Sequence, residues 1–511
     1  MPLPSRTPWK PASSRRALRS AVLVALSAGL VAAALPAPAP LGIGDPLFPH
    51  LGNPGYDVLS YDIDLTYPGR NTAPLAGVTR IEALATDDLE RINLDFTHGT
   101  VSAVTVDGEP AAYASSGEDL VITPAHPVGE GDAVEITVTH TSDPTGPVDS
   151  GGWVRTGDGL ATALQADAAH RVFPSNDHPA DKAYFTFRIT APSTLTAVAN
   201  GLAESHVRNG DTTTWTYRTT HPMATELAQV SIGESTVVRR RGPHDLPVRD
   251  VVRTADRELL EPWLRRTPGH LEWMERQVGP YPFETYGVLI ADADTGFELE
   301  TQTLSLFERG LFTEPAYPEW FVDSVMVHEL AHQWFGDSVS PRTWSDLWLN
   351  EGHATWYEAL YAEEKAGKSM ERRMKAAYAD SDAWRADGGP PAAPKPPQPG
   401  EKISLFRPVV YDGAALVLYA LRHEIGADAF QRLERTWVSE HRDGTASTAD
   451  FTALAARISG RDLSRFFADW LYGKKTPPMP GHPDWRSRAP QRAAGAKSAP
   501  SAGADSAAKP G

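Results

Sequence analysis

Two histidines four residues apart, His328 and His332, are the residues of this sequence best spaced to bind a metal ion. They lie in the stretch Phe321 to Phe335, which has no proline or glycine and is followed by Gly336, so the stretch is expected to form one helix. Residues four apart on a helix project from one face, and the two imidazole rings can converge on a single ion. Glu329 points to the flank of that ion, where its carboxylate reaches a bound water rather than the metal.

A catalytic zinc ion takes three protein ligands and keeps one position open. Glu351, separated from His332 by 18 residues, is the candidate third ligand. Pro341 breaks the chain between them, and a second helix from about Ser345 is expected to return antiparallel to the first. In such a His2Glu site zinc lowers the pKa of a water molecule, and Glu329 takes its proton and later passes it to a leaving amine. The predicted chemistry is metal-assisted amide hydrolysis.

Composition limits the other possibilities. The chain has 511 residues, 41% of them hydrophobic, which suits two or three folded units with flexible ends. Without cysteine, metal must be held by histidine and carboxylate, and no disulfide can form. The net charge of -17 becomes -22 when residues 1–39, with five basic and no acidic groups, are removed. Neither nucleic acid nor an anionic membrane is therefore expected as a partner.

The first 39 residues are typical of an export signal. Basic residues up to Arg19 precede an apolar run from Ala21 to Leu35, and small residues suited to a signal peptidase follow. The run is too short to span a bilayer comfortably, so a retained membrane anchor is the less favoured alternative. The pair Arg15-Arg16 suits either the general secretory or the twin-arginine route. The mature protein is expected to be secreted.

Two kinds of periodicity divide the rest of the chain and predict a multidomain α+β protein. From about 45 to 235, apolar and polar residues alternate, which predicts an N-terminal β-sandwich or saddle-shaped domain. From 236 to 475 the apolar spacing becomes mainly helical and predicts the catalytic domain. The proline-rich residues 386–402 are expected to form an extended loop between helices, and residues 476–511 a disordered tail.

The motifs HELAHQWFG and WSDLWLNEG, with their 18-residue gap, resemble the signature of the M1 family of zinc aminopeptidases, within the gluzincin group. FPSNDHPADKAYF, MATELAQVSIG, GPYPFETYG and VYDGAALVLYALR extend the similarity over about Tyr56 to Tyr472. The resemblance implies an N-terminal saddle-like β-domain followed by a thermolysin-like, mainly helical catalytic domain. It also implies one zinc ion per chain and peptide substrates trimmed from the N-terminus. The chain looks like a short form that lacks the large helical C-terminal domain of many members.

The resemblance assigns three further roles. Tyr411 in VYDGAAL matches the family's tyrosine that stabilises the oxyanion. Glu300 in GFELET matches the glutamate of the GAMEN-type strand that binds the free α-ammonium, although Thr301 replaces the usual asparagine and the glycine lies one place earlier. A polar residue of the β-domain helps to bind the N-terminus in the family. Gln165 or Asp167 matches it, with Gln165 favoured.

Neighbouring polar residues have secondary assignments. Asn350 and Thr355 are candidates to orient the metal-binding histidines. His353 is expected to pack in the interior rather than act as a fourth ligand. Glu298 would face the same side as Glu300 on a strand, where it would favour Lys or Arg substrates.

Two other functions stay open. If Glu300 is misplaced, the same zinc scaffold would serve as an endopeptidase. A catalytically silent binding protein would also keep the fold, but such proteins usually lose a ligand or the general base, and this sequence keeps the ligands together with Glu329 and Tyr411.

Overall fold

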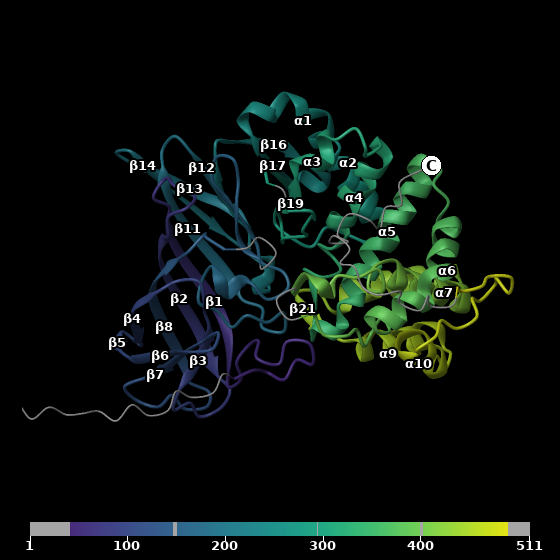
Figure 1. Ribbon diagram of the computed structural model, residues 1–511, viewed down its shortest axis with the longest axis horizontal. Coiled ribbons are helices and arrows are strands. Elements are labelled where there is room, and N and C mark those ends of the chain that lie inside the picture. Colours follow the sequence, from purple (N-terminus) through teal and green to yellow (C-terminus); the bar gives the residue numbers. More distant parts are fainter. Residues whose placement is uncertain (1–40, 147–150, 294, 399–401, 489–511) are drawn as a thin grey trace, which may run out of the picture. The chain divides into compact units, whose positions relative to one another are not determined.

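The computed structural model describes residues 41–146, 151–293, 295–398 and 402–488 (Figure 1). The expected export signal lies outside the described residues. Among the helices of these ranges, none combines the length and the apolar character that crossing a bilayer requires.

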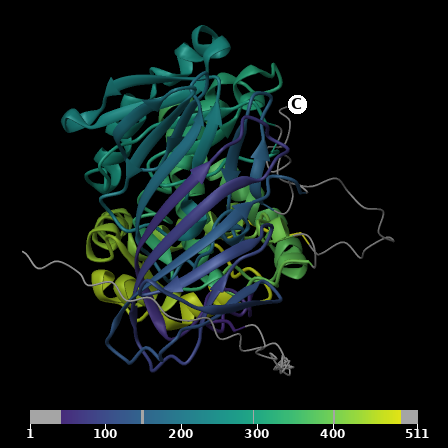
Figure 2. The same cartoon turned by 90° about the vertical axis from the view of Figure 1, so that its left-hand side faces the viewer.

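The N-terminal domain is built on an eight-stranded sheet whose strands lie side by side in the order β13-β14-β11-β1-β2-β8-β4-β5 (Figure 2). Strand β1 pairs in parallel with β11 and antiparallel with β2. The strands are β1 (Tyr56–Thr66), β2 (Leu75–Ala85), β4 (Val101–Val106), β5 (Glu109–Pro110), β8 (Ala133–Ser142), β11 (Tyr184–Pro192), β13 (Leu202–Asn209) and β14 (Thr212–Arg218).

The predicted alternation of buried and exposed side chains holds over most of β1. Tyr61, Ile63 and Leu65 are buried as predicted. Leu59, expected on the same face, is 43% exposed, and Val58 is buried in its place. The cause is a register shift in the pairing of β1 with β2 between Val58 and Ser60, which moves the strand by one residue and exchanges its two faces.

Two smaller sheets complete this domain. One has the order β3-β7-β6 and the other the order β12-β15-β10-β9. Their bounds are β3 (Ile92–Asp95), β6 (Ala112–Ser116), β7 (Asp119–Thr123), β9 (Gly152–Arg155), β10 (Leu160–Ala163), β12 (Thr196–Ala199) and β15 (Val230–Gly233). The last of these strands ends at Gly233, close to the change of periodicity in the sequence.

The second domain begins with a sheet of four strands, β16 (Ser235–Arg241), β17 (Pro247–Arg253), β18 (Val288–Ala291) and β19 (Ser305–Glu308). The sequence predicts only one of them, in TYGVLIADA. Two helices lie between β17 and β18, namely α1 (Arg257–Leu264) and α2 (Thr267–Val278). The helices after β19 are α3 (Arg309–Thr313), α4 (Glu319–Ala331), α5 (Trp348–Ala366), α6 (Met370–Gly388), α7 (Asp412–Ile425), α8 (Ala427–Glu440), α9 (Thr448–Ser459) and α10 (Ser464–Tyr472). Two short strands, β20 (Val339–Pro341) and β21 (Gly444–Ala446), pair with each other. Helix α5 packs between α4 and α7. The expected order, a β-domain followed by a mainly helical domain, is confirmed.

Two boundaries in this domain differ from the predictions. The disordered tail was expected from residue 476, but residues 476–488 fold back on α6, where Met479 and Trp485 are buried and Tyr378 Oη donates to the carbonyl of Pro477. The tail prediction is therefore wrong up to residue 488, because these two apolar side chains gain a buried surface. Helix α6 also extends to Gly388, so the proline-rich loop begins later than 386.

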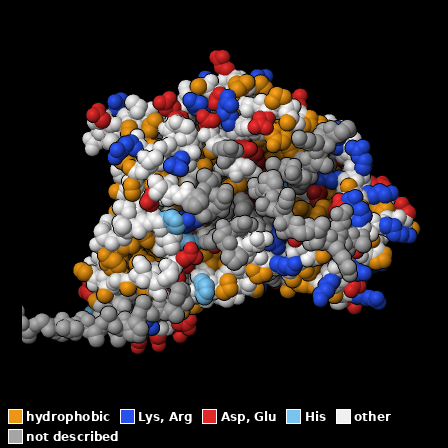
Figure 3. Space-filling view, viewed as in Figure 1, with side chains coloured by type: hydrophobic (Ala, Val, Ile, Leu, Met, Phe, Trp, Pro, Cys, Tyr) orange, Lys and Arg blue, Asp and Glu red, His pale blue; other side chains and the backbone are white. Residues whose placement is uncertain are grey.

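Charged side chains are mixed over the surface. On the face shown in Figure 3, Lys and Arg side chains lie among Asp and Glu side chains and among uncharged surface.

Candidate metal centre

Helix α4 and the turn after it present the two histidines. His328 lies in the last turn of α4, and His332 directly follows the helix with helical torsion angles, φ -57° and ψ -27°. The helix ends at Ala331 rather than at the predicted Phe335, but the helical conformation of His332 keeps both rings on one side. Their centroids are 4.9 Å apart.

The first turn of α5 supplies the third ligand. Glu351 Oε2 lies 3.5 Å from His328 Nε2 and 3.6 Å from His332 Nε2. All three side chains are buried, and Glu351 Oε2 has no hydrogen-bond partner. Zinc bonds of about 2.0–2.2 Å in a tetrahedron separate neighbouring ligand atoms by roughly 3.3 Å. The three donors therefore fit a zinc ion.

The turn between the two helices is fixed on both sides. Gly336 has φ +134°, and a Cβ there would lie 3.3 Å from Asn350 Nδ2 and 3.4 Å from His332 Nδ1. A glycine is therefore needed at this turn, which lies close to both Asn350 and His332. Thr343 and Asp346 form a capping box that starts the 3-10 helix leading into α5.

The groups that orient the histidines are partly different from those predicted. His328 Nδ1 lies 3.3 Å from Glu358 Oε2, and His332 Nδ1 lies 3.1 Å from the carbonyl of Phe335. Thr355 Oγ1 is buried without a hydrogen-bond partner, so its predicted role is not met. The sequence contained a signal for Glu358, because it follows Glu351 by seven residues and so shares a face of α5.

Glu358 is itself held by charge. Arg373 donates to Glu358 Oε1 at 2.7 Å and to Asp412 Oδ1 at 2.8 Å. Burial alone would raise the pKa of Glu358, but the Arg373 charge and the hydrogen bond with His328 outweigh it and set this pKa to about 2. An ionised acceptor therefore fixes the His328 ring with Nε2 turned to the metal position.

The field at the metal position favours a cation. Burial opposes the charged forms, but neighbouring charges outweigh it. The two histidines lower the pKa of Glu351 to about 2. Glu351 and Glu358 raise the pKa of His328 to about 9, and Glu300 and Glu351 raise the pKa of His332 to about 9. Ionised Glu351 and Glu358 thus lie on either side of the His328 ring. A divalent ion placed between the three ligands would take up this negative charge.

Glu329 lies beside the metal position. Its Oε2 is buried and has no hydrogen-bond partner. Burial raises the pKa of Glu329 well above its usual value, and the charges of Glu300, Glu298 and Glu351 add to the effect. Ligand atoms of Glu300, Glu329 and His332 all lie within 4.8 Å of one another. A cation bound between the three ligands would lie close to this carboxyl group and would favour its ionised form.

Glu300 and Gln165 meet beside the same centre. Gln165 Nε2 donates to Glu300 Oε1 at 2.6 Å, and that oxygen lies 4.0 Å from His332 Nδ1. The carbonyl of Glu300 accepts from Gln333 Nε2 at 2.9 Å, which ties the segment to the turn after α4. Asp167 is buried, and its charge acts on Arg171. Of the two candidates from the β-domain, Gln165 is the one that contacts Glu300.

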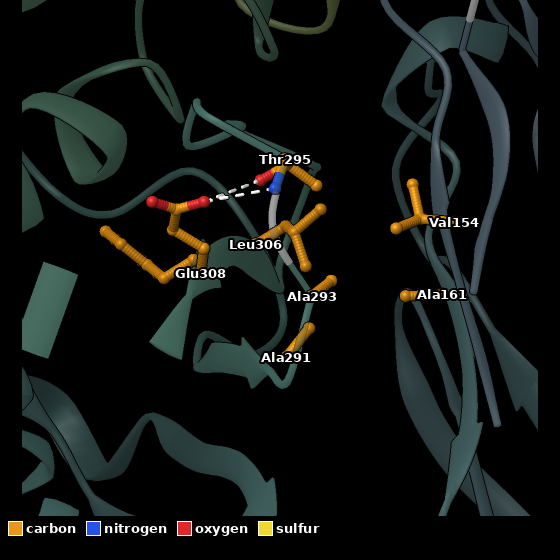
Figure 4. A pocket seen from close by; sticks show the side chains of 8 residues that line it. Val154, Ala161, Ala291, Ala293, Thr295, Leu306 and Glu308 are labelled. Atoms are coloured by element: carbon orange, nitrogen blue, oxygen red, sulfur yellow. Dashed lines mark hydrogen bonds between the residues drawn. The ribbon is translucent and has the colours of Figure 1, made fainter. Parts of the chain in front are cut away.

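The segment before Glu300 is fastened to β19. The Glu308 carboxylate accepts hydrogen bonds from Thr295 N and Oγ1 and from Gly296 N, and Glu308 N donates to Glu298 Oε2 at 2.7 Å. Figure 4 shows Glu308 turned to Thr295 beside a small apolar pocket, across which lie Val154 and Ala161 of the β-domain. One oxygen of Glu298 is therefore occupied by the main chain.

Tyr411 faces the centre from the start of α7. Its ring centroid lies 6.1 Å from that of His328. Burial, together with the charges of Glu351, Glu300 and Glu329, raises the pKa of Tyr411 well above its usual value. The phenol therefore stays protonated and can donate a hydrogen bond.

His353 is a packed residue. Its ring stacks on Phe335 with centroids 4.3 Å apart, and Nδ1 lies 2.5 Å from the carbonyl of Leu349. His353 Nε2 lies 3.3 Å from Glu434 Oε1. These contacts turn it away from the His2Glu centre, as predicted.

Comparisons with known proteins agree with this architecture. The model of the peptidase M1 N-terminal domain matches residues 58–227, and that of the peptidase family M1 domain matches residues 264–470. The M1 zinc metallopeptidase of Deinococcus radiodurans has 27% sequence identity and a TM-score of 0.72, with 86% of this chain and 99% of that chain covered. A mutant of that protein bound to a Tyr-Ser-Ala substrate is equally similar, with a TM-score of 0.73 and 27% identity over 86% of this chain and 100% of that chain.

Curated relatives are more distant and longer. Aminopeptidase N of Streptomyces lividans is 24% identical over 437 residues, which are 81% of this chain and 50% of the relative. Aminopeptidase 2 of Candida albicans is 26% identical over 321 residues, which are 60% of this chain and 34% of the relative. The fold and the His2Glu centre place the chain in the class of zinc metallopeptidases. Within that class it belongs to peptidase family M1.

Proposed function

We propose that this protein is a zinc-dependent aminopeptidase that removes N-terminal residues from peptides. The observation that carries the proposal is the contact of Gln165 with Glu300 beside the His2Glu centre. A carboxylate in that place binds a free α-ammonium and sets the first peptide bond against the metal position. The substrate-bound relative supports a peptide as the ligand.

His328, His332 and Glu351 would hold the zinc ion, which would supply a Lewis acid for the scissile carbonyl and lower the pKa of a water molecule so that it loses a proton and becomes a nucleophile. Glu329 takes the proton of the attacking water on its unpartnered Oε2. The water oxygen bonds to the carbonyl carbon, the C–N bond breaks, and Glu329 returns the proton to the leaving amine. No further reactant is needed.

Tyr411 stabilises the charge that develops on the carbonyl oxygen. Because its pKa is raised, the phenol is a hydrogen-bond donor throughout the neutral and alkaline range. Tyr411 lies at the start of α7 and Glu300 in the segment before β19, so the carbonyl and the α-ammonium are held by different elements.

The acidic surroundings favour a cationic N-terminus. Glu298, Glu300 and Glu329 lie close enough for their charges to act on one another. A free α-ammonium neutralises part of this charge, whereas an N-acetylated terminus leaves Glu300 buried without a cation. Removal of the ammonium charge is therefore expected to lower kcat/KM strongly.

A panel of aminoacyl anilides and short peptides tests the proposal. Turnover of free substrates is expected, with loss on chelation and recovery on adding zinc, and Glu300→Ala is expected to raise KM. Equal cleavage of a peptide and its N-acetylated form would instead establish an endopeptidase. Bound zinc with no turnover of any substrate would establish a binding protein.

We further propose that the protein is secreted, on the basis of the signal-like residues 1–39. The route is either the general secretory or the twin-arginine one. Mass spectrometry of the protein recovered from the medium of an expressing bacterium is expected to find a new N-terminus near residue 39. Recovery only from cells, with Met1 intact, would contradict it.

A further inference from the structure

The segment before the first strand, residues 45–51, is here named the N-terminal arm. Its apolar side chains Leu47, Phe48 and Leu51 are all buried. They belong to a small hydrophobic cluster that is separate from the two main cores and is completed by Ala166, Trp344, Leu347, Leu405, Val409 and Val410. The arm is therefore part of the interior of the protein although it precedes every strand of the β-domain.

Asp45 anchors the arm. Its Oδ1 accepts from Leu47 N at 2.7 Å and from Phe48 N at 3.1 Å, which folds the arm into a turn. Its Oδ2 accepts from Trp344 N at 2.8 Å and contacts His178 Nε2 at 3.2 Å. One buried carboxylate thus joins the arm to the catalytic domain and to the β-domain.

Phe48 is the main side-chain contact. Its ring meets Trp344 edge to face with centroids 5.8 Å apart. Trp344 is fully buried and begins the 3-10 helix that leads into α5. Edge-to-face pairs of this kind stabilise a fold beyond the burial of their area.

The cluster touches three chain segments that each carry a residue of the site. Ala166 follows Gln165, and Trp344 with Leu347 leads to Glu351. Val409 and Val410 immediately precede Tyr411, and Tyr411 itself packs against this cluster. The torsion angles of Tyr411, φ -92° and ψ -99°, are not those of a helix, so α7 alone does not aim its ring.

We propose that Phe48 and Asp45 of the N-terminal arm are positioning residues for catalysis, which hold Tyr411 at the metal centre through Val409 and Val410. The proposal rests on the proposed role of Tyr411. A donor displaced by about 1 Å loses most of its effect on a transition state, at a cost of up to about 100-fold in rate. The arm therefore acts on turnover.

The two histidine ligands are held by contacts outside this cluster. Ring contacts with Glu358 and with the Phe335 carbonyl hold His328 and His332, and both helices pack in the large core of the catalytic domain. Loss of the Phe48 ring is therefore expected to lower kcat by about 10- to 100-fold. Zinc content is expected to stay at one per chain, with KM for a leucyl anilide changed less than about twofold.

A double-mutant cycle tests the coupling, with the purified full chain loaded with zinc and assayed on a leucyl anilide. The variants are Phe48→Ala, Tyr411→Phe and the two combined. Phe48→Ala is expected to lower kcat when Tyr411 is present and to have almost no further effect with Tyr411→Phe. Equal losses of kcat in both backgrounds, unchanged kcat, or loss of zinc would each overturn the proposal.

Phe96→Ala is the matched control. Phe96 is 6% exposed and Phe48 is 7% exposed, and Phe96 meets His140 edge to face at 5.2 Å within the β-domain. It is expected to lose stability like Phe48→Ala but to keep kcat per bound zinc. A matching loss of kcat would show a general effect of lost packing and overturn the arm's role.

Two further variants keep the test decisive. If Phe48→Ala does not fold, Phe48→Leu replaces it in the same cycle, because leucine keeps most of the side-chain volume. Asp45→Asn tests the carboxylate that anchors the N-terminal arm. If Tyr411→Phe has the kcat of the wild type, the proposed role of Tyr411 fails together with the arm. If Tyr411→Phe lowers kcat but the effect of Phe48→Ala is additive, only the arm proposal fails.

Discussion

At the scale of single residues, the proposed chemistry depends on the protonation of buried carboxylates. Glu329 has no partner for its Oε2, whereas Glu351 and Glu358 face histidines. The pKa of the same residue type is therefore raised at Glu329, where burial dominates, and lowered at Glu351 and Glu358, where cationic partners dominate.

Glu329→Gln keeps the shape of the side chain and removes the proton acceptor. We expect kcat to fall by about 10²- to 10⁴-fold, since a positioned general base contributes that much. Zinc content measured by atomic absorption is expected to stay at one per chain. Activity close to that of the wild type would show that another group takes the proton.

Glu358→Gln is expected to weaken zinc binding by about 10- to 100-fold, because it removes the anion that orients His328. It also leaves Arg373 with Asp412 as its remaining partner. Zinc affinity is measured by competition with a chelator of known strength. Glu363→Gln, an exposed acid on the same helix, is the control, and an equal loss of affinity in both variants would contradict the assignment.

At the scale of elements, the local sequence pattern predicted the two helices of the metal site, whereas contacts with neighbouring segments determined where the elements end. The stretch 321–335 without proline or glycine and the break at Pro341 are local features, so both helices were predicted. The end of α4 at Ala331 is set by the turn at Gly336, where the main chain approaches Asn350. The register shift in β1 arises from its pairing with β2, and the alternation of residues within β1 does not predict it.

Strand β8 carries a histidine that makes the β-domain sensitive to acid. His140 lies opposite Gly77 of β2, where the missing side chain leaves room for the ring, and its Nε2 contacts Thr79 Oγ1 at 2.9 Å. Burial lowers the pKa of His140 to about 4, against a slight opposing effect of the Thr141 carbonyl. The unfolded chain then binds more protons than the folded one between about pH 4 and 6.5.

Stability is therefore expected to fall as the pH is lowered through this window, by about 2 kcal/mol from this group between pH 7 and pH 5. Urea unfolding at the two pH values measures the difference. His140→Gln is expected to reduce it by that amount, whereas His126→Gln, which changes an exposed histidine, is expected to leave it unchanged. An identical difference in all three proteins would refute the assignment.

At the scale of the whole molecule, the site is shared between the two domains. Gln165 and Glu300 are 135 residues apart in the chain. Lys182 of the β-domain donates to the carbonyls of Asp337 and Ser338, next to the turn after α4. The β-domain is therefore part of the centre.

Gln165→Ala tests this sharing. The variant is expected to raise KM for a leucyl anilide by about tenfold, because one charge-assisted hydrogen bond of about 1.5–3 kcal/mol that fixes Glu300 is lost. Steady-state kinetics measures KM, and the ratio of kcat/KM for free and N-acetylated peptides is expected to fall. An unchanged ratio would place the amine-binding role in the catalytic domain alone.

The sequence alone determined the His2Glu metal-binding group and the order of the two domains. The metal ligands follow from short-range geometry, since a spacing of four on a helix and a return helix after a proline leave few ways to place the three side chains. The order of the domains follows from the change from strand to helix periodicity along the chain. Only the tertiary structure decided that Gln165 contacts Glu300, that Glu358 and Arg373 support His328, and that the N-terminal arm packs beneath Tyr411. Those contacts join segments far apart in the chain, and their geometry depends on how separate cores pack together, which no local period encodes.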